Sequence, residues 1–170
     1  SSDFILRNAD GNGVVAKGAT EALVVVTGTN ATEIKYEGLK EGTYTVCNPA
    51  SATNDRGIRL LSAVVDETPV SVTKDYAFDA ATDSVVSKLD KNDKVDAGKY
   101  GTEGYFTFSG SVKRANSSTL SVEIGKTETG LLTFTVSGTA DAAFKVSSTG
   151  STNSSDFILR NADGNGVVAK

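Results

Sequence analysis

Ser1–Lys17 reads SSDFILRNADGNGVVAK, and Ser154–Lys170 repeats that sequence without a change. The two copies are offset by 153 residues, so one unit of about 150 residues carries its own leading segment and a second copy of it. Chance does not produce a match of this length, and divergent repeats are rarely perfect. The duplication therefore bears on how the chain assembles.

Three explanations of the duplication stay open at the level of sequence. In the first, the segment is a donor strand that fills the unpaired sheet edge of an incomplete sandwich, and appending it to the C-terminus after a polar linker gives a self-complemented chain. Thr149–Asn153, TGSTN, has the composition of that linker. In the second, the chain comes from a tandem array and extends into the next repeat. In the third, the duplication has no structural role.

The repeated segment predicts two short strands rather than one long strand. Phe4–Arg7 and Val14–Lys17 are strand candidates, and Asn8–Gly13 between them contains the turn dipeptides Asp-Gly and Asn-Gly. A continuous strand is the alternative, but its even-numbered face is polar in the middle. A strand that fills an apolar groove prefers apolar residues along the whole of one face. We therefore expect a hairpin or a sharp corner.

The composition and the periodicity predict a mainly β protein. The chain has 17 Gly, only 2 Pro and 38% apolar residues, which suits many strands and turns. Alternating or β-branched runs predict strands at Glu21–Thr29, Thr32–Glu37, Thr43–Cys47, Gly57–Val65, Pro69–Lys74, Tyr105–Ser109, Ser111–Lys113, Thr119–Ile124, Leu132–Val136 and Phe144–Val146. Strands at this spacing indicate a sandwich or a barrel. We expect an immunoglobulin-like antiparallel β-sandwich completed by a donor segment.

Three local patterns add detail to this expectation. The β-branched run in Glu21–Thr29 predicts a strand buried on both faces. The alternation in Thr119–Ile124 and Leu132–Val136 predicts one antiparallel hairpin, with a turn at 126–130. The pattern over Tyr76–Leu89 predicts the one short helix of the chain, and an edge strand over Asp83–Val86 is the alternative.

Composition excludes several functional classes. The chain has no His, which removes Ser-His-Asp and Cys-His catalysis and His-ligated zinc. Its single cysteine, Cys47, cannot form an intrachain disulfide, and we expect it to be buried. The net charge of −4 is not accompanied by a basic cluster, so we expect no nucleic-acid partner. No apolar run has the length of a bilayer span, so we expect no membrane insertion. We expect no catalytic residue, no cofactor and no enzyme activity.

One weak metal motif occurs inside the repeated segment. Asn8, Asp10 and Asn12 alternate and precede Gly13, as the first ligands of a calcium loop do. The twelfth position of such a loop requires a bidentate Glu, but Ala19 stands there. A turn is therefore the favoured interpretation of these residues.

Two Gly-x-Tyr motifs, Gly42-Thr43-Tyr44 and Gly98-Lys99-Tyr100, occur in this Ser/Thr-rich β pattern. Together with the duplicated N-terminal segment, they resemble chaperone–usher-like pilins and other donor-strand-exchanged fibre subunits. The resemblance implies polymerisation outside the cell or on its surface. Its partners are copies of the chain itself, with an assembly chaperone or a host surface ligand as further candidates. A tandem-repeat surface adhesin and a bacteriophage tail, fibre or decoration protein are the alternatives.

These inferences give a predicted division of the chain. Residues 1–148 form a β-sandwich domain with a connector segment at 1–17, residues 149–153 form a linker, and residues 154–170 act as the complementing strand. The apolar residues of the two copies are the candidates for the inter-subunit strand: Phe4, Leu6, Val14, Val15, Phe157, Leu159, Val167 and Val168. We expect one copy to complete the domain's own sheet through its four apolar side chains.

Overall fold

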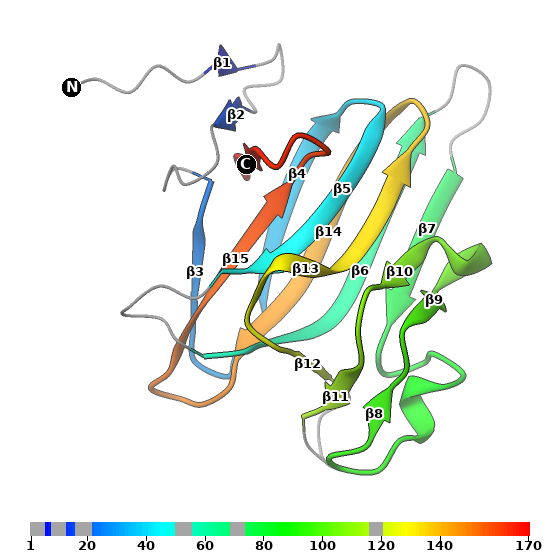
Figure 1. Cartoon of the computed structure of the whole chain (residues 1–170), viewed down its shortest axis with the longest axis vertical. Helices are drawn as coiled ribbons and strands as arrows, with labels where there is room; N and C mark the ends of the chain where they lie inside the picture. Colours follow the sequence, from blue (N-terminus) through cyan, green and yellow to red (C-terminus); the bar gives the residue numbers. More distant parts are fainter. Residues whose placement is uncertain (1–5, 8–12, 16–21, 50–55, 69–73, 116–120) are drawn as a thin grey trace.

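The computed structural model describes residues 6–7, 13–15, 22–49, 56–68, 74–115 and 121–170. Two antiparallel sheets pack face to face, and no helix of 7 or more residues is present in this part of the chain. Figure 1 shows the two layers, with the C-terminal strand β15 running through the nearer one. The predicted antiparallel β-sandwich is therefore confirmed.

The first sheet contains nine strands among the described residues. Its path runs β1-β2-β16-β15-β5-β13-β10-β9, and β3 also pairs with β15. The strands are β1 (Leu6–Arg7), β2 (Gly13–Val15), β3 (Val24–Thr27), β5 (Gly42–Asn48), β9 (Gly98–Tyr100), β10 (Phe106–Phe108), β13 (Thr127–Val136), β15 (Ser154–Arg160) and β16 (Gly166–Val167). Both copies of the repeated segment thus contribute strands to one sheet.

The second sheet contains seven strands among the described residues. Its path runs β4-β14-β6-β12-β11-β8, and β7 also pairs with β6. The strands are β4 (Thr32–Leu39), β6 (Ile58–Thr68), β7 (Lys74–Asp79), β8 (Lys94–Val95), β11 (Val112–Arg114), β12 (Val122–Ile124) and β14 (Thr139–Ser148). Two 3₁₀ turns, η1 (Val86–Lys88) and η2 (Thr102–Gly104), complete the regular structure.

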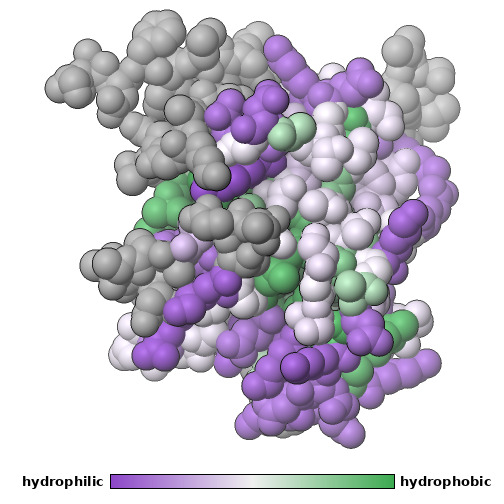
Figure 2. Space-filling model, in the orientation of Figure 1, coloured by the Kyte–Doolittle hydropathy of each residue, from purple (hydrophilic) through white to green (hydrophobic). Residues whose placement is uncertain are grey.

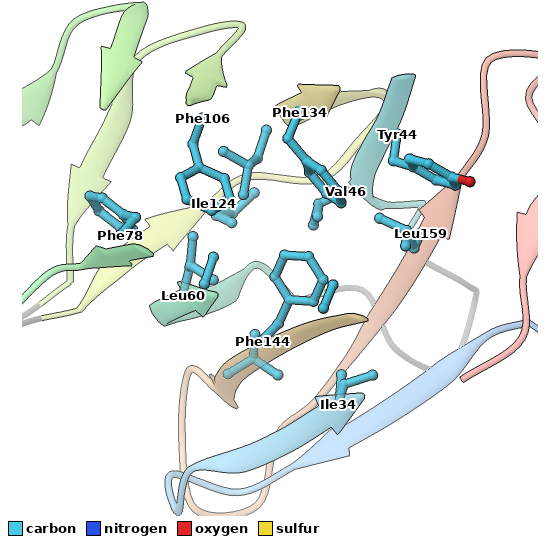
Figure 3. Packing of buried hydrophobic residues seen from close by; sticks show 14 of the residues in the cluster. Ile34, Tyr44, Val46, Leu60, Phe78, Phe106, Ile124, Phe134, Phe144 and Leu159 are labelled. Atoms are coloured by element: carbon cyan, nitrogen blue, oxygen red, sulfur yellow. The ribbon is translucent and has the colours of Figure 1, made fainter. Parts of the chain in front are cut away.

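The core lies between the two sheets and is rich in aromatic side chains. Phe144 stands near its centre, with ring centroids 6.0 Å from both Tyr36 and Phe134. Leu60 and Ile124 extend the cluster toward the other end of the sandwich (Figure 3). Since strand side chains alternate between faces, the period-two pattern of the sequence supplies one apolar face per strand, and these faces meet here.

The helix expected over Tyr76–Leu89 is wrong, and so is the alternative edge strand. β7 runs through the start of this segment and pairs with β6, with Phe78 in the core. A carboxylate oxygen of Asp79 then accepts the N–H of Ala81, and Asp83 accepts the N–H groups of Val85 and Val86. These side-chain bonds compete with helical ones, so only a single 3₁₀ turn follows.

The hairpin expected between Thr119–Ile124 and Leu132–Val136 is also wrong. β12 pairs with β6 and β11, whereas β13 pairs with β5 and β10 in the opposite sheet. The expected turn at 126–130 is largely part of β13. The alternation of apolar and polar residues specifies which face of each strand is buried, but not which strand lies beside it. Strands of opposite sheets bury their apolar faces in the same core, as the two strands of a hairpin would.

One further expectation differs from the structure, and another lies almost entirely outside the described residues. The run Glu21–Thr29 is not buried on both faces, because Val26 is buried while the side chain of Val25 is 52% exposed. The expected strand Pro69–Lys74 lies outside the described residues except for Lys74, which begins β7.

Gly130 lies where the pairing of β13 with β5 shifts register between Thr127 and Leu132. Its φ is +82°, and a Cβ there would collide with the Thr45 side chain and lie 3.0 Å from the Val46 carbonyl oxygen. A glycine with positive φ is typical of a β-bulge.

We expect Gly130→Ala to lower the free energy of unfolding by at least about 1–2 kcal/mol, the cost of a left-handed backbone at a residue with a Cβ. Urea denaturation measures this change. Gly125→Ala is the matched control, because a Cβ at Gly125 meets nothing within 4 Å. Equal losses in the two variants would contradict the assigned role of Gly130.

Candidate functional site

The second copy of the repeated segment forms a central strand of the first sheet. Ser154–Phe157 pair with β3, and Ile158–Arg160 pair with β5 on the opposite edge. β16 then folds back and pairs with Leu159 and Arg160 on the edge that also holds β3 (Figure 1). Leu159 and Arg160 therefore have paired strands on both edges, and Ser155 has β3 on one edge and an isolated bridge to Arg56.

Both faces of β15 are buried. Phe157 and Leu159 are fully buried in the main core, and Val167 of β16 joins them. On the outer face, Ile158 forms a separate apolar cluster with Ala22 and Cys47. A strand covered on two faces behaves as an interior element of the fold, although it comes from the end of the described chain.

The inner side chains of β15 contact both sheets. The rings of Phe157 and Phe144 have centroids 5.5 Å apart. Leu159 lies opposite Val46 in the register and points into the core beside it (Figure 3). Burial raises the pKa of the Tyr36 phenol, and the nearby backbone of Leu159 offsets part of that rise.

The start of β15 is fixed by hydroxyl groups. The Ser155 hydroxyl donates to the carbonyl oxygen of Gly57 at 2.7 Å and lies 2.7 Å from the Ser148 hydroxyl. The Thr27 and Ser154 hydroxyls are 2.9 Å apart. Ser155 is completely buried. Ser155 is not among the residues predicted from sequence, because a small polar residue next to an apolar run gives no periodic signal.

The turn of the second copy is built by an asparagine side chain. The Asn161 Oδ1 accepts the backbone N–H groups of Asp163 and Asn165, at 3.1 and 3.0 Å. The calcium candidates Asn8, Asp10 and Asn12 of the first copy lie outside the described residues. Within the described residues, no group of three or more Cys, Asp or Glu side chains is arranged to hold a metal ion.

The first copy of the segment lies at the margin of the same sheet. Its hairpin consists of β1 and β2, and β2 pairs with β16. Leu6 lies in β1 and Val14 and Val15 lie in β2, whereas Phe4 is outside the described residues. In the second copy, Val168 is half-buried against the cluster of Ile158 and Cys47. The role of these eight residues between subunits stays a prediction.

The outer surface of the first sheet is less hydrophilic at its centre than at one end. Figure 2 shows a pale surface over β5 and β13, with strongly hydrophilic side chains gathered at the end that carries β8. Part of the pale surface is a threonine pair, Thr43 and Thr135, whose hydroxyls are 3.1 Å apart. This surface carries no arrangement of groups that identifies a ligand.

Three aspartates lie side by side on the second sheet. Asp66 of β6 is directly opposite Asp141 of β14 on one edge and Asp75 of β7 on the other. Partial burial first, and then Asp75 and Asp141, raise the pKa of the Asp66 carboxyl. Like charges directly opposite one another in a sheet are destabilising.

The chain matches no protein-family model, no curated protein and no solved structure. Among the described residues, no helix has the length and apolar character needed to cross a membrane.

We expect Leu159→Ala to lower the free energy of unfolding by about 2–5 kcal/mol, as for other large-to-small core substitutions. The substitution is best made in residues 18–170, where no competing first copy is present. Val25→Ala is the control, since that side chain is largely exposed. An equally small effect of both substitutions in urea denaturation would contradict the central position of β15.

We expect Asp66→Asn to stabilise the fold at neutral pH. A raised pKa means that the folded state holds the Asp66 proton more tightly than the unfolded state. The resulting stability is present below about pH 4 and is lost as the pH rises through the folded-state pKa. Since Asp66 is exposed and screened, the gain at pH 7 should be about 0.2–1 kcal/mol. Urea denaturation at pH 3 and pH 7 measures it, and an equal gain at both would contradict this origin.

Proposed function

We propose that this chain is a structural subunit of an extracellular polymer, a pilus or a related fibre. In this proposal, the N-terminal segment of one subunit inserts into the sandwich of the next. The observation that carries the proposal is the placement of the second copy as β15, between β3 and β5 and buried on both faces. The first copy has the same sequence, so in a neighbouring subunit it makes the same contacts.

Without residues 154–170, the first sheet has a gap. β5 loses the neighbour that pairs with it from Thr45 to Cys47, and β3 loses its pairing with Ser154–Phe157. Exposed edges of this kind recruit strands from other chains. The gap also has an apolar lining, because Phe157, Ile158, Leu159 and Val167 are buried in it. Full burial of such side chains contributes about 1.5–3 kcal/mol each, which gives the gap a strong preference for a matching segment.

The short linker explains how one chain fills its own gap. Between β14 and β15, the Gly28 N–H donates to the carbonyl oxygen of Asn153 at 3.0 Å, and the Asn153 N–H donates to Gly150 at 3.1 Å. This tight turn delivers Ser154 directly to β3. A linker this short gives the tethered copy a high effective concentration at the gap, so the self-filled chain resists exchange.

A tandem-repeat surface adhesin is the second candidate, and one feature of the sheet favours it. β16 and β3 lie on the same edge of β15, with Val167 opposite Leu159 and Val24 opposite Phe157. The second strand of a hairpin of residues 1–17 in this position ends beside the start of β3 on that edge, and the residues from 18 to 23 span that distance easily. The first copy can therefore complete its own domain, and the second copy then begins another repeat.

Deletion of Ser154–Lys170 tests the proposal. We expect the remaining chain, residues 1–153, to polymerise through exchange of residues 1–17, with a growing mass in light scattering. A monomer with the melting temperature of the full chain would contradict exchange and would support the tandem repeat.

A peptide experiment sharpens the result. The synthetic peptide SSDFILRNADGNGVVAK should bind residues 1–153, stop their polymerisation and restore the melting temperature of the full chain. The control peptide carries Asp in place of its Phe and Leu, which correspond to the buried Phe157 and Leu159. Equal activity of the two peptides would contradict insertion of the segment into the core.

A further inference from the structure

The two copies form the same hairpin in different surroundings. In the first copy, Leu6 pairs with Val14 and Arg7 with Gly13. In the second copy, the corresponding residues pair in the same register, Leu159 with Val167 and Arg160 with Gly166. The second hairpin is embedded in the sandwich, whereas the first lies at the margin of the sheet. The hairpin is therefore a local unit that keeps its register outside the core.

The two hairpins also pair with one another, and this pairing is symmetric. β2 and β16 are antiparallel, with Val14 opposite Val167 and Val15 opposite Gly166. Val167 is the counterpart of Val14 in the second copy, so the same position of the segment faces itself. An antiparallel pair centred on one position has a local two-fold axis, and a surface that pairs in this way is complementary to itself.

The hydrogen-bond pattern identifies the groups on the outer edge of β16. The Asn161 N–H donates to the carbonyl oxygen of Asn165 at 2.9 Å, so these two residues form a hydrogen-bonded pair. Hydrogen-bonded and non-bonded pairs alternate along an antiparallel ladder. The next hydrogen-bonded pair is Leu159 with Val167, and the backbone groups of Gly166 and Val168 point to the opposite edge, where β2 lies.

Apart from its pairing with β2, this outer edge has none of the usual protection against strand pairing. Natural proteins protect edges with proline, bulges or charged side chains. From Gly166 to Ala169 the segment has no proline and no charged residue. The nearest charge, Lys170, is turned to β4, where its N–H donates to the carbonyl oxygen of Lys35 at 2.9 Å and its Nζ pairs with Glu37.

We propose that the outer edge of β16 is a self-association surface, and that its partner is the same edge of a second copy of this chain. Two sandwiches then share one continuous sheet across a two-fold axis at Val167. In the polymer proposed above, where each gap holds one hairpin, this edge joins two filaments side by side. Only that last step rests on the proposed function.

The test removes the first copy, because β2 occupies the edge in the full chain. Every buried core residue that the structure describes lies at Ala22 or beyond, so residues 18–170 retain both apolar clusters. We expect residues 18–170 to form a dimer in analytical ultracentrifugation, and the full chain to remain a monomer at the same concentration. A monomer of residues 18–170 at concentrations up to about 1 mM, equivalent to a binding free energy weaker than about −4 kcal/mol, would overturn the proposal.

A second measurement identifies the interface. Val167 forms a non-hydrogen-bonded pair with its equivalent across the axis, so the two Cα atoms should be about 4.5 Å apart. A sample mixed from labelled and unlabelled chains should show an intermolecular NOE between the Hα atoms of the two Val167 residues. The corresponding contact in the full chain is the intrachain NOE between Val14 and Val167. A dimer without the Val167 contact would place the interface elsewhere.

Val168→Pro supplies the matched variant. Proline removes one outward N–H of the edge, and it is tolerated on edge strands where that N–H faces solvent. In residues 18–170 this variant should still melt cooperatively, at a temperature lowered by the lost packing of Val168 against Ile158 and Cys47, and should sediment at half the mass of the parent dimer. In the full chain, the same variant should lose the NOE between Val14 and Val167. Persistence of the dimer in the variant would overturn the proposal.

The outcome is independent of strand exchange. Residues 18–170 have a filled gap and no free copy of the segment, so they cannot polymerise by insertion. If residues 1–153 stay monomeric, the polymer proposal fails while the edge pairing can still be observed. If residues 18–170 stay monomeric, the edge-pairing proposal fails, while polymerisation of residues 1–153 by strand insertion can still be observed.

Discussion

The whole first sheet depends on the hydrogen bonding of β15. This strand pairs with β3 and β16 on one edge and with β5 on the other, and it connects strands that otherwise share no neighbour in the described sheet. Its side chains are simultaneously part of the main core and of the cluster on the outer surface. The backbone pairing and the apolar burial of this segment therefore depend on the same strand.

Identical sequences raise the question of which copy fills the gap. The contacts inside the gap cannot favour one copy over the other, because the side chains are the same in both copies. The difference lies in the connection. The second copy follows β14 through a tight turn that is bonded to Gly28, whereas the first copy precedes β3 through residues 16–23. In the structure the second copy fills the gap, and the two copies differ in how they connect to the rest of the chain.

The sequence predicted the sandwich well because alternation reports burial directly. β4, β5, β6 and β14 lie where strands were predicted, and Tyr44 of the Gly42-Thr43-Tyr44 motif is buried in the core. The same signal does not identify the neighbour of a strand. For this reason the hairpin of Thr119–Ile124 with Leu132–Val136 was wrong, although both segments present the expected apolar faces to the core.

The helix over Tyr76–Leu89 failed for a different reason. Apolar spacing in that segment was compatible with a helical period, but Asp79 and Asp83 satisfy nearby backbone N–H groups in turns. Of the candidate site, the sequence specified the repeated segment and its hairpin, because the Asn and Gly residues of a turn act locally. The buried Ser155 and the contact of Ile158 with Cys47 depend on the three-dimensional path of β5 and were not accessible to pattern analysis.

The burial of Cys47 in the outer apolar cluster depends on the second copy of the repeated segment. Cys47, the single thiol of the chain, lies directly opposite Ile158 in the register and is 1% exposed. Its cover includes residues of the second copy, Ile158 and Val168, so the cover is present only while a hairpin occupies the gap. The reactivity of this one thiol toward alkylating reagents should therefore depend on whether residues 154–170 occupy the gap.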